Sequence, residues 1–307
     1  MKSTLLLAIG SLALGAVPLS AQYEGTVPLV LKLPGGARAL GLGNAFTAGR
    51  GPEVIFYNPA QIGLNRGTTL SLQRFGSAST LGALSTAGPF GKVAIAAGVQ
   101  YLDYGADLTG LTPEPGDLTR RGALNAASLV AGIAVQYIWK GVRFGAGAKY
   151  AEERVATGRD GGLLFDFGAG REFGNVTLAL AVQHVGSDIG FAGYQAKVPT
   201  RVSLGGALPR TRLGTFFDLG LAASVARERD GRIVPAAGAE LVYAPVDGWT
   251  FVARAGVRRT ADGSSVTRAE SPVSVGGSFG LDRLWVDYAF EPYKGPGATH
   301  RIGIRIQ

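Results

Sequence analysis

The sequence contains no cysteine, one methionine and two histidines among its 307 residues. Without cysteine the chain has no disulfide, no thiolate nucleophile and no cysteine-based zinc site. The histidines, His184 and His300, fall on separate strand-like segments, and neither has a carboxylate at metal-ligand spacing. We therefore expect neither a metal site nor a cofactor.

Charged residues are also scarce, at 17% of the chain, although the formal net charge is +8. Lysine and arginine are scattered singly, and the densest clusters are the pairs Arg120-Arg121 and Arg258-Arg259. Nucleic-acid binding needs a basic stripe or patch, so we expect no nucleic-acid partner. No Gly-x-Ser-x-Gly elbow or serine–histidine pairing is visible, and we expect no enzyme activity.

Long apolar runs are confined to the N-terminus. Lys2 is followed by an apolar stretch from Leu5 to Val17 and by the small residue Ala21 at a cleavage position. This order is typical of a secretory signal peptide, which we assign to residues 1–21. No later segment has eighteen consecutive apolar residues, so we expect no transmembrane helix.

What the sequence does contain is apolar–polar alternation with a period of two, from Thr68 to the end. In residues 142–150, for example, one face carries Val142, Phe144, Ala146, Ala148 and Tyr150. Successive side chains of a strand point to opposite faces, so each such segment predicts a strand with one oily face. About fourteen of these segments follow one another, several joined by turns such as Lys140-Gly141 and Asp247-Gly248.

The faces opposite the oily ones are rich in glycine, alanine and serine, with isolated charges. A water-exposed sandwich would carry more lysine, glutamate and threonine there, whereas a narrow lumen suits small residues. We therefore predict an all-β fold, a transmembrane antiparallel up-and-down barrel of about fourteen strands over residues 67–307. Trp139 and Trp249 would then lie in the lipid-interface girdle, and Trp285 would face the lumen.

Ten charged residues alternate with the oily positions and are predicted to face the lumen: Arg143, Lys149, Asp166, Arg201, Asp218, Arg254, Arg283, Asp287, Arg301 and Arg305. Seven are cations. One interpretation is a set of ion pairs that stiffens a narrow barrel, because the aspartates need partners. The other is a pore that prefers anions.

The segment "LPGGARALGLGNAFTAG", residues 33–49, contains Gly41-Leu42-Gly43. A dinucleotide fingerprint needs a preceding strand, a small residue at the sixth position and a βαβ unit. Phe46 occupies the sixth position and no βαβ pattern follows, which excludes that reading.

The same segment, read with Asn58-Pro59-Ala60, resembles the N-terminal signature of PorV/PorQ-type outer-membrane proteins of the FadL-like (long-chain fatty-acid transporter) barrel group. The matching residues are Gly36-Ala37-Arg38-Ala39, Gly41-Leu42-Gly43, Ala45-Phe46 and Ala48. The chain departs from the signature at Gln61, where glycine is common, and at Arg50 and Glu53, where the pattern is acidic.

The resemblance implies a barrel in the bacterial outer membrane whose N-terminal segment, residues 22–66, folds into the lumen as a hatch. Small residues would let this segment pack closely there. The residues expected to form the hatch and its lumen contacts are Arg38, Asn44, Asn58, Pro59, Asp166, Asp218, Arg254 and Asp287. A buried arginine needs a partner, so we predict that Arg38 contacts a lumen carboxylate, with Asp166, Asp218 and Asp287 as the candidates.

The resemblance also implies a function in transport or as a type IX secretion accessory. The alternatives are a FadL-like channel for hydrophobic small molecules and a structural scaffold that binds partners through the loop from Gly105 to Gly122. The expected partners are outer-membrane lipid and either secretion-machinery proteins or hydrophobic ligands.

Overall fold

The computed structural model describes residues 28–64, 66–75, 79–105, 126–155, 158–191, 194–259, 272–292 and 298–307. The expected signal peptide (1–21) and most of the 105–122 loop lie outside these residues. Among the described residues, no helix has both the length and the apolar character needed to span a membrane.

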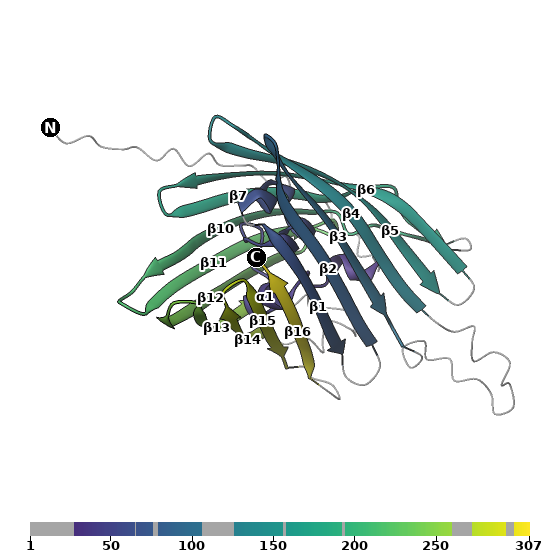
Figure 1. Ribbon diagram of the computed structural model, residues 1–307. Coiled ribbons are helices and arrows are strands. Elements are labelled where there is room, and N and C mark those ends of the chain that lie inside the picture. The colour runs from purple at the N-terminus through teal and green to yellow at the C-terminus, as the bar shows by residue number, and fades with distance from the viewer. Residues whose placement is uncertain are drawn as a thin grey trace, which may run out of the picture.

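Fourteen strands form one closed antiparallel barrel (Figure 1), which confirms the predicted fold and strand number. Its strands are β1 (Gly67–Phe75), β2 (Ser79–Phe90), β3 (Val93–Asp103), β4 (Ala126–Trp139), β5 (Val142–Val155), β6 (Gly158–Phe173), β7 (Val176–Gly186), β10 (Arg201–Arg212), β11 (Phe217–Glu228), β12 (Ile233–Val246), β13 (Trp249–Arg258), β14 (Val273–Leu281), β15 (Leu284–Glu291) and β16 (Thr299–Ile306). Pairing of β1 with β16 closes the barrel. Strands β8 (Ile189–Phe191) and β9 (Tyr194–Ala196) form a separate two-stranded sheet.

The period-two alternation separates two surfaces of this sheet. Apolar side chains such as Leu72, Ile133 and Ile302 point outward and are 57–67% exposed, while their sequence neighbours point into the lumen and are buried. A contiguous apolar belt of this kind is unfavourable in water and matches the lipid face of a membrane barrel. Trp139 and Trp249 lie outward at strand ends, as predicted, and Trp285 is buried on the lumen side.

The two ends of the barrel differ in their connections. Short turns near Gly91, Gly141, Gly174 and Gly248, all with positive φ, join strands at one end, which we call the short-turn end. The barrel begins and finishes at this end, since Gly67 and Ile306 lie there close together. Strands β3, β7 and β13 end at the opposite, long-loop end, and the longer sequence intervals 104–125, 187–200 and 259–272 separate them from β4, β10 and β14.

The N-terminal segment, residues 28–64, lies inside the barrel (Figure 1). It contains three short 3₁₀-helices and one α-helical turn: η1 (Leu29–Lys32), α1 (Ala37–Gly41), η2 (Pro52–Phe56) and η3 (Pro59–Leu64). Helix α1 contacts β13 to β16, η3 packs mainly against β2 to β6, and η1 lies against β3 and β4. One segment therefore touches both sides of the lumen wall.

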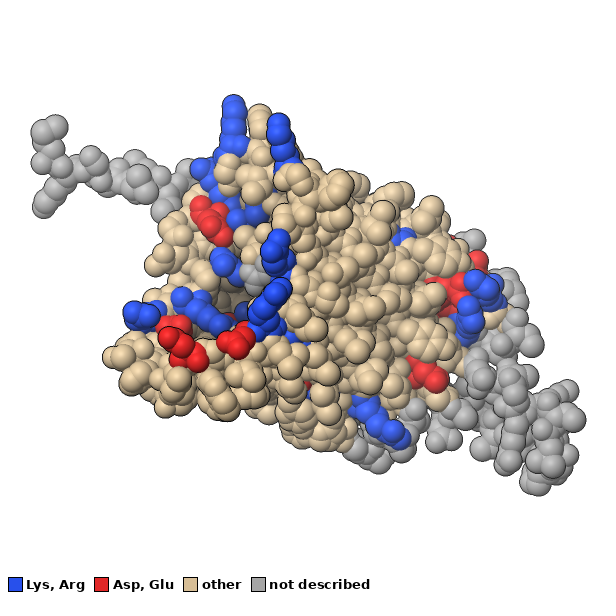
Figure 2. Space-filling model, viewed as in Figure 1, with Lys and Arg blue, Asp and Glu red and all other residues tan. Residues whose placement is uncertain are grey.

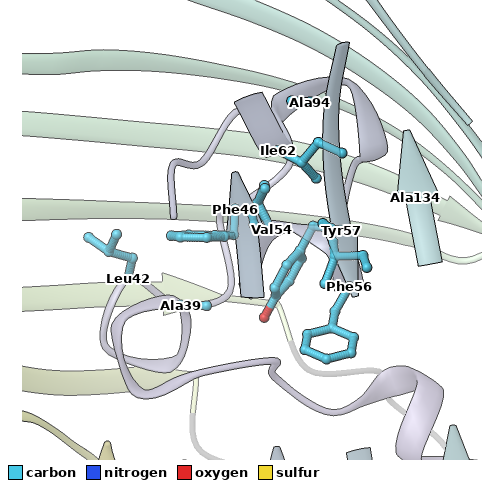
Figure 3. Close-up of a cluster of buried hydrophobic side chains, with 12 residues drawn as sticks. Ala39, Leu42, Phe46, Val54, Phe56, Tyr57, Ile62, Ala94 and Ala134 are labelled. Atoms are coloured by element: carbon cyan, nitrogen blue, oxygen red, sulfur yellow. The ribbon is translucent and has the colours of Figure 1, made fainter. Parts of the chain in front are cut away.

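The centre of this segment forms a small apolar core of its own (Figure 3). Phe46 and Tyr57 meet edge to face with ring centroids 5.2 Å apart, and Val54, Phe56 and Ile62 surround them. Ala94 and Ala134 from the barrel wall complete the cluster. Because aromatic contacts of this geometry add to simple burial, the core holds η2 and η3 together as one body.

Glycines in the wall allow this body to approach the strands at main-chain distance. A side chain at Gly145 of β5 would come within 2.2 Å of the Pro59 carbonyl carbon, and one at Gly256 of β13 within 2.0 Å of the Gly43 nitrogen. No β-carbon tolerates such distances, so both positions require glycine. Small inward residues therefore make room for the N-terminal segment, as the sequence predicted.

Candidate functional site

Helix α1 brings Arg38 to the lumen wall in the short-turn half of the barrel. Its Nη2 lies 3.0 Å from Oε1 of Glu240 on β12, and its Nη1 donates to the Arg50 carbonyl at 2.9 Å. The guanidinium also lies 5.8 Å from the Phe46 ring centroid. Arg38 is thus tied to the wall and to the apolar core of the N-terminal segment at the same time.

Glu240 is the centre of a larger charge network. Its carboxylate also accepts from Nε of Arg254 at 3.2 Å and from Nε of Arg210 at 3.3 Å. Arg254 in turn reaches Asp287, with Nη1 and Oδ1 3.6 Å apart, and Arg305 lies 3.2 Å from the same aspartate.

We call these six residues the charge network: Arg38, Arg210, Arg254, Arg305, Glu240 and Asp287. It holds four guanidinium groups and two carboxylates, and the carboxylate of Glu53 lies near enough to act on Arg38. Burial disfavours a charged Arg38, but Glu240 and Glu53 outweigh burial and raise its pKa above the ordinary value. Figure 2 shows acidic and basic side chains gathered around a hollow at the end of the barrel where the C-terminus lies.

Arg38 pairs with a lumen carboxylate, as predicted, but this is Glu240 and none of the three candidate aspartates. Asp166 is on β6, where it pairs with Lys149, and Asp287 is occupied by Arg254, Arg305 and Ser278. Half-buried Asp218 lies near the short-turn end of β11. Glu240 was not among the predicted lumen residues, although it shares the lumen face of β12 with Gly238 and Val242.

Arg283 is a second correction. It was expected to face the lumen, but it is exposed in the turn between β14 and β15, where its Nε donates to the Gln307 carbonyl at 2.7 Å. The alternation was read one residue too far, because the strand begins at Leu284. Turn residues have no fixed face, so a period-two pattern does not place them.

Asn58 and Pro59 organise the start of η3. The Asn58 Oδ1 atom accepts the N–H of Ala60 at 2.9 Å, and its Nδ2 donates to the carbonyls of Thr47 and Leu180. Proline fits the first helical position, because its missing N–H would have no partner there. Asn58 therefore caps a helix and joins two parts of the N-terminal segment to β7.

Asn44 and Tyr57 form a second polar link inside the N-terminal segment. Asn44 has a φ of 65°, and its Oδ1 accepts the Tyr57 hydroxyl at 2.5 Å, while that hydroxyl accepts the N–H of Gly35 at 2.8 Å. Burial raises the pKa of Tyr57 to about 12. The phenol thus stays protonated and donates to Asn44 throughout the neutral range.

Asp166 has a local structural role. Its Oδ2 lies 2.5 Å from Lys149 Nζ, and its Oδ1 accepts the backbone N–H of His184 at 2.8 Å. His184 has a φ of 58° in a bulge of β7, where the register shifts against β6. The carboxylate thus replaces the strand hydrogen bond that the bulge removes. His184 itself is buried.

The long-loop half of the lumen is different, because large apolar side chains line it. Leu81, Leu102, Val130 and Leu164 come from β2, β3, β4 and β6 and are at most 2% exposed. Ala151, Ile189 and Val198 belong to the same cluster. We call this group the apolar chamber.

The chain's own helix η1 occupies the apolar chamber. Val30 is fully buried in it, and Leu29, Leu31 and Leu33 pack against it. Ile189 and Val198, in the connection between β7 and β10, close the chamber. Asp188 of the same connection pairs with Arg229 in the turn after β11, with Oδ1 and Nη1 2.6 Å apart. The chamber was not predicted from the sequence, although Leu81, Leu102 and Val130 occupy inward positions in the alternation of their strands.

Arg301 separates the two halves. It is fully buried on β16, and its Nη1 donates to the Pro34 carbonyl at 2.6 Å and to Gln73 at 2.8 Å. Pro34 lies between η1 and α1, so this contact fixes the point where the N-terminal segment passes from the apolar chamber to the charge network. Among the described residues, no group of three or more histidine, aspartate or glutamate side chains is placed to hold a metal ion.

Comparisons with known proteins give a structural match only. No family model matches the sequence, and no curated protein matches it either. The solved structures with similar folds include the Pseudomonas putida toluene transporter TodX (TM-score 0.56, 11% identity, covering 89% of this chain and 96% of that one) and the Ralstonia pickettii toluene transporter TbuX (0.53, 14%, 90% and 98%). A third is the monoaromatic hydrocarbon channel CymD (0.51, 11%, 83% and 91%). The chain thus has the fold of these channels, a closed antiparallel fourteen-stranded barrel.

Proposed function

We propose that this chain is an outer-membrane channel that admits small hydrophobic molecules, with its N-terminal segment as a hatch. The apolar belt supports a membrane location, and short turns normally face the periplasm in bacterial barrels. The apolar chamber then faces the outside and the charge network faces the periplasm.

The observation that carries this proposal is the apolar chamber. A barrel lumen is usually polar, whereas Leu81, Leu102 and Leu164 turn inward here and give half of this lumen an apolar lining. Apolar walls bind apolar ligands, and closing residues such as Ile189 keep water away. Helix η1 fills the chamber with leucine and valine side chains, which occupy the space that a small hydrocarbon would take.

The similar folds of the toluene transporters and the hydrocarbon channel support this uptake role. The PorV/PorQ resemblance and a part in type IX secretion receive no support from these neighbours. No described feature of the barrel favours a protein cargo.

The proposal is tested by measuring the entry of radiolabelled toluene into bacterial cells whose outer membrane carries the protein. The double variant L102N/L164N makes the chamber polar. We expect its initial rate of toluene entry to fall several-fold, toward that of cells without the protein. Val252→Asn is the matched control, because Val252 is also a buried inward apolar residue but lies outside the chamber. Equal entry with and without the wild-type protein would overturn the proposal.

A further inference from the structure

The lipid face of the barrel is hollowed in one sector. Across β2 to β6, a hollow of about 750 Å³ lies over small residues such as Gly88, Ala97, Ala146 and Ala148, between Ile133, Val135 and Phe165. These side chains alternate with the lumen-facing ones and therefore point outward. The wall is thinner here than beside it, because small residues replace the large ones of the apolar belt.

A second hollow of about 650 Å³ adjoins the first on β1 to β5. The two share Thr86, Ala97, Ile133 and Ala148, and the second extends past Leu84 and Val99. Two adjoining apolar grooves match the two acyl chains of one phospholipid.

Three exposed cations stand above these grooves at the short-turn end. Lys92 lies in the turn between β2 and β3, Lys140 in the turn between β4 and β5, and Arg171 on the outer face of β6. Lys140 Nζ lies 4.9 Å from the Trp139 ring centroid, and the Arg171 guanidinium 5.2 Å from that of Phe173. Cation–π contacts of this kind hold the charges at the membrane interface.

The depth also fits a lipid. Val135 in the groove and Lys140 at the rim are five residues apart, roughly 16 Å along a strand, which is about 12 Å of depth for strands tilted by about 40° and lies within one hydrocarbon leaflet of about 15 Å. Neighbouring strands are about 4.8 Å apart, so each cation stands roughly 10 Å or less from the next. One phosphate can contact two of them.

The opposite sector lacks this combination. A hollow of about 600 Å³ lies there over small residues such as Gly206, Ala223 and Ala239. The nearby turns carry exposed acids, Asp247 and Asp282, beside Arg212 and Arg283. The two sectors therefore share the groove and differ in rim charge, because the cations of the first sector stand where the opposite sector has acids and bases together.

We propose that the grooves on β1 to β6, with Lys92, Lys140 and Arg171, form a binding site for one anionic phospholipid of the periplasmic leaflet. The cations bind its phosphate and the grooves hold its acyl chains. This inference rests on the proposed membrane orientation, because the short-turn end must face the leaflet that supplies the lipid.

The test uses purified, folded protein in nanodiscs that contain equal amounts of phosphatidylglycerol and phosphatidylethanolamine with identical acyl chains. Native mass spectrometry then counts the lipids that stay bound to the protein after it is released from the nanodisc. We expect one phosphatidylglycerol to be retained in preference. The triple variant K92Q/K140Q/R171Q should lose this preference by roughly tenfold or more, because each cation near an anionic headgroup contributes about fivefold.

A second variant tests the grooves separately from the charges. A97L/A148L fills the shared part of both hollows and should lose the retained lipid while keeping all three cations. The matched controls are A223L/A239L, which fills the opposite hollow, and R212Q/R227Q, which removes two exposed cations elsewhere. Both should retain phosphatidylglycerol like the wild type.

Equal retention of the two lipids by the wild type would overturn this inference, as would unchanged retention by A97L/A148L. A second copy of the chain on this face, seen as a dimer, would also overturn it. Failure of the protein to enter nanodiscs as a heat-modifiable barrel would instead count against the proposed function.

Discussion

The two halves of the lumen are built on opposite physical principles. The long-loop half contains apolar side chains around η1, and contact there is non-directional. The short-turn half contains the charge network around α1, where four guanidinium groups share two carboxylates with defined geometry. Both helices belong to one short segment, and Arg301 holds the Pro34 carbonyl between them.

The two halves therefore differ in which of their contacts an apolar ligand can replace. An apolar contact such as that of Val30 can be replaced by any apolar ligand of similar size, because it carries no directional requirement. A buried ion pair such as Arg38–Glu240 cannot be replaced by a hydrocarbon, since removal of one partner leaves an unpaired charge. The long-loop half is therefore suited to exchange, and the short-turn half to sealing.

The largest effect is expected from breaking the charge network at its centre. Glu240→Ala leaves Arg38 and Arg254 buried without their shared carboxylate, and we expect a loss of about 3–5 kcal/mol in the free energy of unfolding. The hatch should loosen, so conductance in planar lipid bilayers should rise. Denaturant unfolding and bilayer recording measure the two quantities.

Arg38→Ala is the sharper form of this test. It removes one link between hatch and wall and leaves the network otherwise paired, since Glu240 keeps Arg254 and Arg210. Conductance should therefore rise with a smaller loss of barrel stability than in Glu240→Ala. Unchanged conductance in both variants would mean that the network does not seal the lumen.

A smaller effect is expected where the wall meets η3. Gly145→Val places a side chain within 2.2 Å of the Pro59 carbonyl carbon, and we expect overpacking to cost about 1–3 kcal/mol and to raise conductance. Gly88→Val is the control, because a side chain there meets no atom within 4 Å. A rise of equal size in the control would show that general strain in the strands, not displacement of η3, opens the barrel.

An effect confined to alkaline pH comes last, because it leaves the wild type unchanged in the neutral range. Tyr57 has a pKa of about 12 in the folded chain, against about 10 when exposed. The hydroxyl therefore stabilises the folded state below pH 10, and this contribution is lost between pH 10 and 12. A shift of two units corresponds to roughly 2–3 kcal/mol.

Tyr57→Phe isolates this contribution from other alkaline effects. The variant should unfold with a flatter pH profile between 10 and 12 than the wild type, and with lower stability at neutral pH. Parallel profiles of the two proteins over this range would contradict the role of the Tyr57 hydroxyl.

Alternation was sufficient to predict the barrel, its strand number and the lumen side of Lys149, Asp166, Arg254 and Asp287. It failed at Arg283, because this residue lies in the turn before β15 and a turn breaks the period. Glu240 and the inward leucines of the apolar chamber were within reach of the same pattern. The leucines could not be assigned to the lumen by residue type, because an apolar side chain on the lumen face of a strand resembles one on the lipid face.

The sequence by itself determined which face of each strand meets lipid, since this depends only on neighbours along the chain. It also determined that the lumen has room for the N-terminal segment, because glycine at positions such as 145 and 256 is a local property. Only the tertiary structure decided that Arg38 meets Glu240, 202 residues away, and that Val30 lies among Leu81, Leu102 and Leu164. The physical reason is closure: the barrel's register and curvature decide which strands face each other across the lumen, and no local period encodes a contact across that space.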